Sequence, residues 1–127
     1  MTDEEYKKKL TKEQYAILRG SATEPPFSGK FDDFFETGDY TCGACGSVLF
    51  KSNTKYDAGC GWPSFWDATD NSKIKLLDDS SLGMHRTEVR CGVCDSHLGH
   101  LFNDGPVEHG RKRYCINSGA LNFEKSK

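Results

Sequence analysis

The chain has 127 residues, a formal net charge of −2 and a mean hydropathy of −0.69. This length allows one domain, and the acidic balance argues against nucleic acid as the main partner, because phosphate binding needs a basic surface. No apolar run approaches the roughly 20 residues of a membrane span, and residues 1–10 lack the apolar core of a signal peptide. We therefore expect a cytoplasmic protein that does not bind membranes.

The first 20 residues predict an N-terminal helical segment. Thr2 and Thr11 each stand three residues before a Glu or Gln, which is the form of a capping box. Gly20 marks the expected helix end. We expect this segment to pack on the core through three apolar side chains, Leu10, Tyr15 and Leu18.

The rest of the chain predicts a loop followed by strands. Residues 21–39 read as a surface loop, because Pro25-Pro26 blocks regular strand pairing. Short strand-like runs separated by Gly, Asn, Asp and Ser clusters then fill residues 40–123. We therefore predict one mainly β domain over residues 1–127, built from short antiparallel strands with helices only at its start.

Four of the six cysteines form two matched pairs, Cys42-Gly-Ala-Cys45 and Cys91-Gly-Val-Cys94. Only 35% of the chain is hydrophobic, so its core should be thin, and small thin-cored domains need a metal or disulfides. Two such pairs supply four thiolates, which suits one tetrahedral, structural zinc ion per chain. The long gap between them means that the metal joins distant hairpins and contributes to folding. A redox dithiol and an iron–sulfur cluster are the alternatives; His97 could compete as a ligand, but four cysteines leave no vacancy.

Cys115 belongs to neither pair, and its neighbours in the sequence favour a reactive thiol over a cysteine that only packs in the core. If residues 113–117 form a strand, alternation places four side chains on one face: Arg111, Arg113, Cys115 and Asn117. Positive neighbours favour the thiolate, which is the nucleophilic form of cysteine. The opposite face, with Tyr114 and Ile116, is expected in the core.

A second polar face follows from the run at residues 97–106. Alternation groups His100, Phe102 and Asp104. A histidine near a cysteine can supply or hold a proton, and Asp104 could orient that imidazole or help position a second proton donor. His97 is harder to place, because Gly99 can break the strand phase. The alternative for His100 alone is a histidine without a catalytic role, either on the surface or hydrogen-bonded in the core.

Cys60 lies between two glycines, which give its backbone freedom to move. A mobile cysteine suits a resolving role, in which it travels to a second sulfur and forms a disulfide. Trp62 follows and could wall an apolar pocket, although core packing is its bland alternative. These parts fit thiolate attack on a sulfoxide, which gives a sulfenic acid on Cys115 that a second thiol condenses with.

Several motifs together make the chain resemble the B-type methionine sulfoxide reductases, which act on the R epimer. They run from LTKEQY at 10–15 to the C-terminal region: PFSG at 26–29, both CGxC pairs, GCGWPSFW at 59–66, HLGHLFNDGP at 97–106 and RYCINS at 113–118. This family fold has two antiparallel sheets. The resemblance therefore implies an oxidoreductase that repairs methionine-R-sulfoxide, mainly in oxidised proteins.

The resemblance also implies roles for individual residues. Cys115 matches the catalytic cysteine and Cys60 the resolving cysteine, whose disulfide thioredoxin would reduce. Trp62 matches the tryptophan that holds the substrate methyl group. The positions that bind substrate and handle protons are matched by His97, His100, Phe102, Asp104, Arg113 and Asn117. The zinc set is matched by Cys42, Cys45, Cys91 and Cys94.

Two other classes of function compete with this interpretation. The first is a non-catalytic zinc module that binds a protein partner, which has no need of Cys115, Cys60 or His100. The second is a secreted disulfide domain, which the absent signal peptide and the paired CGxC motifs disfavour. We expect the protein to act as a monomer.

Overall fold

A computed structural model describes the chain except for residues 1–2, 21, 26–28, 30, 32–33, 57–60, 80–85 and 126–127. Cys60, the predicted resolving cysteine, and most of the PFSG motif therefore lie outside the described residues. The described part contains no helix with the length and apolar character that crossing a bilayer requires.

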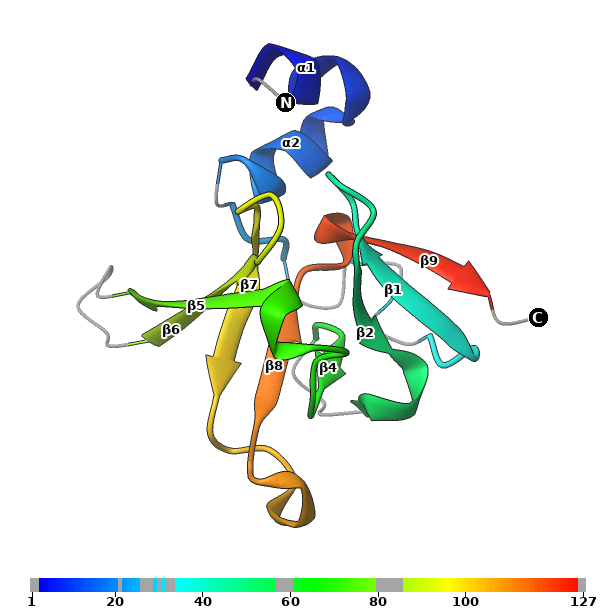
Figure 1. The fold of residues 1–127 in the computed structure, drawn as a ribbon, viewed down its shortest axis with the longest axis vertical. Helices are drawn as coiled ribbons and strands as arrows, with labels where there is room; N and C mark the ends of the chain where they lie inside the picture. The colour runs from blue at the N-terminus through cyan, green and yellow to red at the C-terminus, as the bar shows by residue number, and fades with distance from the viewer. Residues whose placement is uncertain are drawn as a thin grey trace.

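Two short helices, α1 (Asp3–Lys9) and α2 (Lys12–Leu18), lie together at one end of the molecule (Figure 1). Thr11 caps α2 as predicted: its hydroxyl accepts from the Gln14 N–H at 3.1 Å, and the Gln14 side chain accepts from the Thr11 N–H at 3.1 Å. Leu10 and Leu18 are buried, which confirms the apolar face of this segment. The other predicted capping residue, Thr2, lies outside the described residues.

The strands form two antiparallel sheets, as expected for a mainly β protein. The three-stranded sheet has the order β2-β1-β9, with bounds Val48–Lys51, Gly38–Cys42 and Leu121–Lys125. The six-stranded sheet has the order β3-β4-β8-β7-β6-β5. Its bounds in that order are Lys55–Tyr56, Ser64–Phe65, Arg113–Ile116, His97–Phe102, Arg86–Cys91 and Ile74–Asp79.

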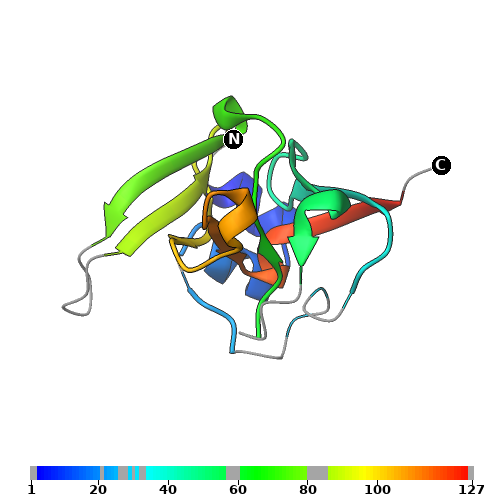
Figure 2. The same cartoon turned by 90° about the horizontal axis from the view of Figure 1, so that it is seen from below.

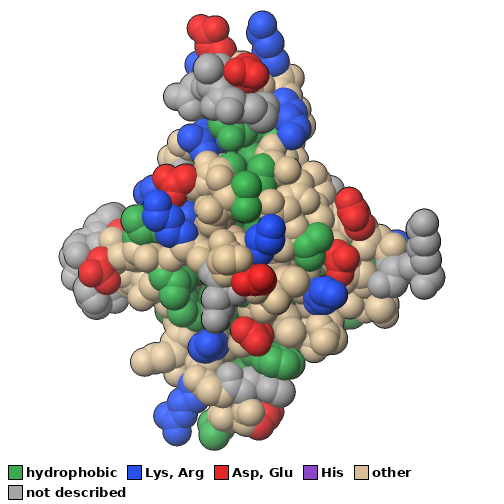
Figure 3. Space-filling model, viewed as in Figure 1, with side chains coloured by type: hydrophobic (Ala, Val, Ile, Leu, Met, Phe, Trp, Pro, Cys, Tyr) green, Lys and Arg blue, Asp and Glu red, His purple; other side chains and the backbone are tan. Residues whose placement is uncertain are grey.

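Short 3₁₀ helices connect several of these strands: η1 (Ser52–Thr54), η2 (Asn71–Lys73), η4 (Val107–His109) and η5 (Ser118–Ala120). The β5–β6 hairpin projects to one side and β9 to the other, with the β7–β8 pair between them (Figure 2). Basic and acidic side chains are interspersed on the face in Figure 3 and do not gather into one basic patch, in keeping with the acidic net charge.

An aromatic core joins the two sheets. Tyr40 and Phe50, from the three-stranded sheet, both contact Phe65 of the other sheet, with ring centroids 5.1 and 4.4 Å apart. Tyr114 and Ile116 are buried, as alternation along β8 predicts. Because β8 is anchored through these two side chains, Cys115 must point to the opposite face of the sheet.

Candidate active site and metal centre

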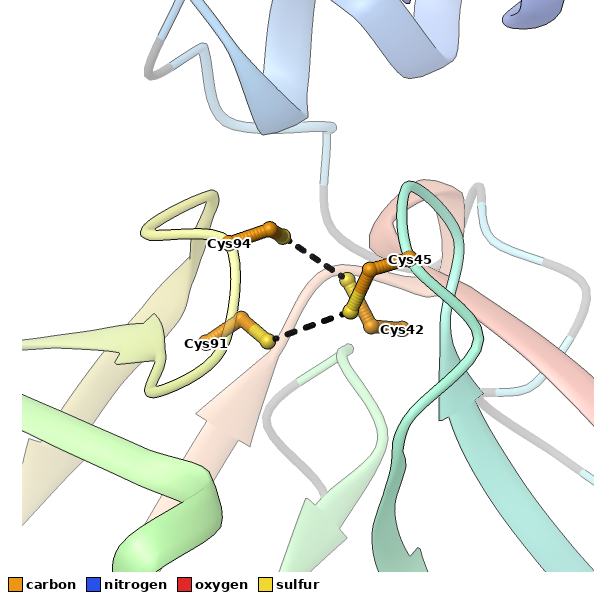
Figure 4. Close-up of side chains that lie close together, drawn as sticks. All are labelled: Cys42, Cys45, Cys91 and Cys94. Atoms are coloured by element: carbon orange, nitrogen blue, oxygen red, sulfur yellow. Dashed lines mark hydrogen bonds between the residues drawn. The ribbon is translucent and has the colours of Figure 1, made fainter. Parts of the chain in front are cut away.

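The four paired cysteines lie on two turns of the same form. One turn joins β1 to β2 and the other joins β6 to β7, so the two turns come from different sheets (Figure 4). In each turn the residue after the second cysteine has a positive φ, +82° at Gly46 and +62° at Asp95. This left-handed residue reverses the chain and brings both sulfurs of its pair toward one point.

The sulfur geometry fits one tetrahedral ion. The Cys42–Cys94 and Cys45–Cys91 Sγ distances are both 3.6 Å, and all four sulfurs lie within 4.8 Å of one another (Figure 4). A zinc–sulfur bond of about 2.3 Å gives a tetrahedron with edges of about 3.8 Å. A disulfide would need sulfurs about 2.05 Å apart. The four cysteines therefore form a group that can hold a metal ion.

The N-terminal helices close over these turns. The Lys9 ammonium donates to the Ala44 carbonyl at 2.6 Å, and the Arg19 guanidinium donates to the Cys94 carbonyl at 3.0 Å. Arg19 also stacks over the Tyr6 ring, 4.6 Å from its centroid. Four thiolates around a divalent cation carry a net charge of −2, so these two cations complement such a cluster.

A small pocket holds the predicted catalytic cysteine. Its volume is about 180 Å³, and it is lined by residues of β6, β7 and β8 together with Thr23, Trp62 and Asn117. Six of the predicted site residues line it: Trp62, His100, Phe102, Arg113, Cys115 and Asn117. Sequence reasoning did not find three others, Thr23, Arg86 and Gly99.

Strand register sets the central pair. His100 of β7 lies directly opposite Cys115 of β8, and Ser64 of β4 lies opposite Cys115 on its other side. Directly opposed residues have Cβ atoms about 4.5–5.5 Å apart and share one face of the sheet. Hydrogen-bonded strands, rather than loops, therefore fix the thiol beside the imidazole.

A bulge brings His97 to the same face. The β6–β7 register shifts between Val89 and Arg90, so that His97 pairs with Arg90 while Gly99 still pairs with Val89. His97 and His100 are three positions apart and would face opposite ways in a regular strand, yet their ring centroids are 5.6 Å apart. The expected break in strand phase is thus present, and Leu98 is the residue that it leaves without an opposite partner.

Each imidazole is held by a carboxylate from another strand of the same sheet, β6 for His97 and β5 for His100. Glu88 lies 2.7 Å from His97 Nδ1, and Asp79 lies 2.8 Å from His100 Nε2. Asp79 also accepts from Arg86 at 3.3 Å. Asp79, rather than Asp104, therefore orients the His100 ring.

The Glu88–His97 pair is buried, and this sets its charges. Burial lowers the pKa of His97 below its ordinary value, although Glu88 opposes this. The neutral ring donates its Nδ1–H to Glu88, and its buried Nε2 has no hydrogen-bond partner within the described part of the chain. Burial alone would raise the pKa of Glu88, but hydrogen bonds from Arg90 and His97 outweigh it and lower that pKa.

Arg113 and Asp104 form an ion pair at the open end of the pocket. Arg113 Nε donates to Asp104 at 2.8 Å, and this bond lowers the pKa of Asp104. The same guanidinium lies 4.4 Å from the centroid of the Phe102 ring. The prediction that Arg111 joins this face is wrong, because Arg111 lies outside β8 with φ +62°. Arg86 of β6 supplies the second guanidinium of the pocket instead.

Trp62 and Asn117 tie the segment at residues 22–25 to the pocket. The Trp62 indole N–H donates to the Glu24 carbonyl at 2.9 Å, and the Asn117 side-chain oxygen accepts from the Glu24 N–H at 3.0 Å. Asn117 also donates to the Leu98 carbonyl at 2.9 Å. Both ends of this amide are therefore used to assemble the pocket wall.

Three charged residues of the site were missed from sequence: Asp79, Arg86 and Glu88. Their signal lies in pairing, because β5 and β6 extend the sheet beyond β7. In the observed register, Leu77, Glu88, His100 and Cys115 occupy successive positions across four strands. Local alternation gives the face of each residue within its own strand, but it does not tell which strands are neighbours.

Comparison with known proteins assigns the chain to a family. Residues 10–125 match the SelR domain family. The chain is 54% identical to the peptide methionine sulfoxide reductase MsrB of Methanosarcina barkeri, over 97% of this chain and 86% of that protein. It is 53% identical to a probable methionine-R-sulfoxide reductase B of Caenorhabditis elegans, over 95% of this chain and 80% of that protein.

The fold is also similar to a more distant solved structure. The crystal structure of the Mis18 "Yippee-like" domain superposes with a TM-score of 0.57 at 16% identity, covering 72% of this chain and 99% of that one. At this identity the likeness concerns the fold alone.

Proposed function

This chain belongs to the MsrB family of peptide methionine sulfoxide reductases, and from this premise we propose that it reduces methionine-R-sulfoxide, mainly in proteins, to methionine. The observation that carries the proposal is the pairing of Cys115 with His100 across two strands inside one pocket. A non-catalytic zinc module would have no need of this pair.

Cys115 is the nucleophile in this proposal. Its thiolate attacks the sulfoxide sulfur, and the sulfoxide oxygen takes up a proton and passes to the cysteine sulfur. Methionine leaves as the thioether and Cys115 becomes a sulfenic acid, so the thiol loses the two electrons that the sulfoxide gains. His100, which Asp79 holds at 2.8 Å, stands at the strand position from which it can deliver that proton.

The pocket lining suits the other parts of the substrate. Arg113 favours the thiolate of Cys115 by its charge, and Asp104 holds that guanidinium in place. Trp62 and Phe102 offer apolar surface to the sulfoxide methyl group. The His97 ring lies 5.6 Å from the His100 ring, and its Nε2, which has no hydrogen-bond partner in the described structure, can accept a proton. Asn117 fixes the pocket wall.

Cys60 is proposed to resolve the sulfenic acid. Its thiol condenses with Cys115, water is released, and thioredoxin then reduces the Cys60–Cys115 disulfide. The chain course supports this role, because Ser64, four residues after Cys60, lies directly opposite Cys115.

We also propose that the four paired cysteines hold zinc as a structural ion. Their sulfur spacing fits that ion, and their distance along the chain makes the metal a link between the two sheets. Residues 1–127 are proposed to act as one domain and as a cytoplasmic monomer. The proposed partners are oxidised proteins and thioredoxin.

The deciding assay measures reduction of blocked R- and S-methionine sulfoxide with dithiothreitol or thioredoxin. We expect turnover of the R epimer only, and activity restricted to the S epimer would refute the proposal. Cys115→Ser should abolish turnover with both reductants. Cys60→Ser should keep turnover with dithiothreitol and lose most turnover with thioredoxin. Full thioredoxin turnover in Cys60→Ser would require another resolving route.

A further inference from the structure

A second cavity, of about 700 Å³, lies beside the Cys115 pocket and has no part in the chemistry above. It is lined by α2, by residues 22–25 and by η5, and Thr23 lines both cavities. Glu24, which the Trp62 indole contacts through its carbonyl, lines this second cavity. A polypeptide that leaves the Cys115 pocket past Thr23 therefore enters the second cavity.

Two carboxylates give this cavity its charge. Glu13 and Glu24 line it, and no Lys, Arg or His is among the described residues of its lining. One Glu24 oxygen accepts from the Gly119 N–H at 2.9 Å, while the other, Oε2, is buried without a hydrogen-bond partner in the described structure. A carboxylate that no cation of the described lining balances attracts a cationic group. Ile17 and Leu121 add apolar surface that suits an aliphatic stem.

The basic residues of the neighbouring Cys115 pocket are balanced locally. Arg86 pairs with Asp79 at 3.3 Å, and Arg113 pairs with Asp104 at 2.8 Å. The negative charge of the second cavity has no such partner within the described residues. Among the described residues that line the two cavities, Glu13 and Glu24 are therefore the charged side chains without an ion-pair partner.

We propose that the second cavity binds the substrate residues that flank the oxidised methionine, and that Glu13 and Glu24 select lysine or arginine there. This inference rests on the proposed function, and it adds a class of preferred protein substrate. Oxidised methionines in basic segments are then reduced faster than those in acidic segments.

The test compares short peptides that each carry one methionine-R-sulfoxide. Lys, Ala or Glu is placed at one flanking position at a time, on either side, and kcat/KM is measured with dithiothreitol. At the position that reaches the cavity, we expect kcat/KM to be about five-fold higher with Lys than with Glu. This ratio should shrink as salt is added, because an accessible ion pair is screened.

Glu13→Gln and Glu24→Gln should each lower the Lys-to-Glu ratio, whereas Glu124→Gln, an exposed change on β9, should leave it unchanged. A ratio taken within one variant is unaffected by partly misfolded protein. If Glu24→Gln does not fold, Glu13→Gln and the salt series still decide the matter.

Three results would overturn the inference: a ratio near one at every position, a preference for Glu, or a ratio that neither glutamine variant alters. Blocked free R-sulfoxide separates this failure from failure of the proposed function. If it is reduced and flanking charge has no effect, only the selection by Glu13 and Glu24 is refuted. If no R-sulfoxide is reduced, the proposed function itself fails.

Discussion

Replacing Glu88 by glutamine tests the buried carboxylate that holds His97. The two side chains meet at 2.7 Å, and both are largely buried. Glutamine keeps an oxygen for the His97 Nδ1–H and loses the charge. A charge-assisted hydrogen bond contributes about 1.5–3 kcal/mol and a neutral one about 1 kcal/mol. We therefore expect Glu88→Gln to lower the free energy of unfolding by about 0.5–2 kcal/mol.

Alanine at the same position removes the acceptor altogether. The buried His97 Nδ1–H would then be left without a partner, and Arg90 would lose its 3.1 Å contact. An unsatisfied buried donor costs about 1–3 kcal/mol, to which the lost contact is added. Glu88→Ala should therefore destabilise the fold by about 3 kcal/mol.

Urea unfolding followed by tryptophan fluorescence measures both effects. With a slope of about 2 kcal/mol per molar urea, the midpoint should fall by about 0.25–1 M in Glu88→Gln and further in Glu88→Ala. Glu124→Gln, exposed on β9, is the matched control and should change stability by less than about 0.5 kcal/mol. A Glu88→Gln midpoint equal to that of the control would refute the reasoning.

Three further predictions concern acid, packing and metal. Burial holds the folded-state pKa of His97 below its ordinary 6.5, so its contribution to stability is complete above that pH and is lost as pH falls toward the folded-state pKa. The urea midpoint should drop between about pH 7.5 and 5.5, and the drop should be smaller in His97→Gln; equal drops would contradict this cause. Gly99→Ala should reduce both stability and R-sulfoxide turnover, because the added Cβ would clash with the Cys115 carbonyl and lie 3.0 Å from Ile116 Cα. A Gly99→Ala variant with the thermal unfolding and kinetics of the wild type would argue against that clash. Removing the metal with a chelator should lower the melting temperature by separating the two sheets, and an unchanged temperature after verified metal loss would show that the cluster is not structural.

The features that could be predicted from sequence are those written in local patterns. The CGxC pairs, the Thr11 capping box and the alternation that buries Tyr114 and Ile116 each depend on residues a few positions apart. The meeting of the two CGxC pairs was also predictable, because one tetrahedral zinc ion takes four thiolates and each pair alone supplies only two.

The missed features depend on pairing between distant strands. Nothing near Asp79 in the sequence indicates that it contacts His100, since that contact needs β5, β6 and β7 in one register. The bulge at Leu98 likewise arises between two strands. The prediction for Arg111 was wrong for a different reason: strand alternation was extended to a residue that precedes the start of β8.

The strand order also has a consequence for how the chain folds during synthesis. β1 is made early and lies between β2 and β9, but β9 is made only after every strand of the six-stranded sheet. On the ribosome, β1 therefore waits with one edge unpaired, and unpaired edges invite wrong partners. Both cysteine turns are complete well before β9 emerges, so metal capture can hold β1 beside the six-stranded sheet while the nascent chain still lacks its last strand.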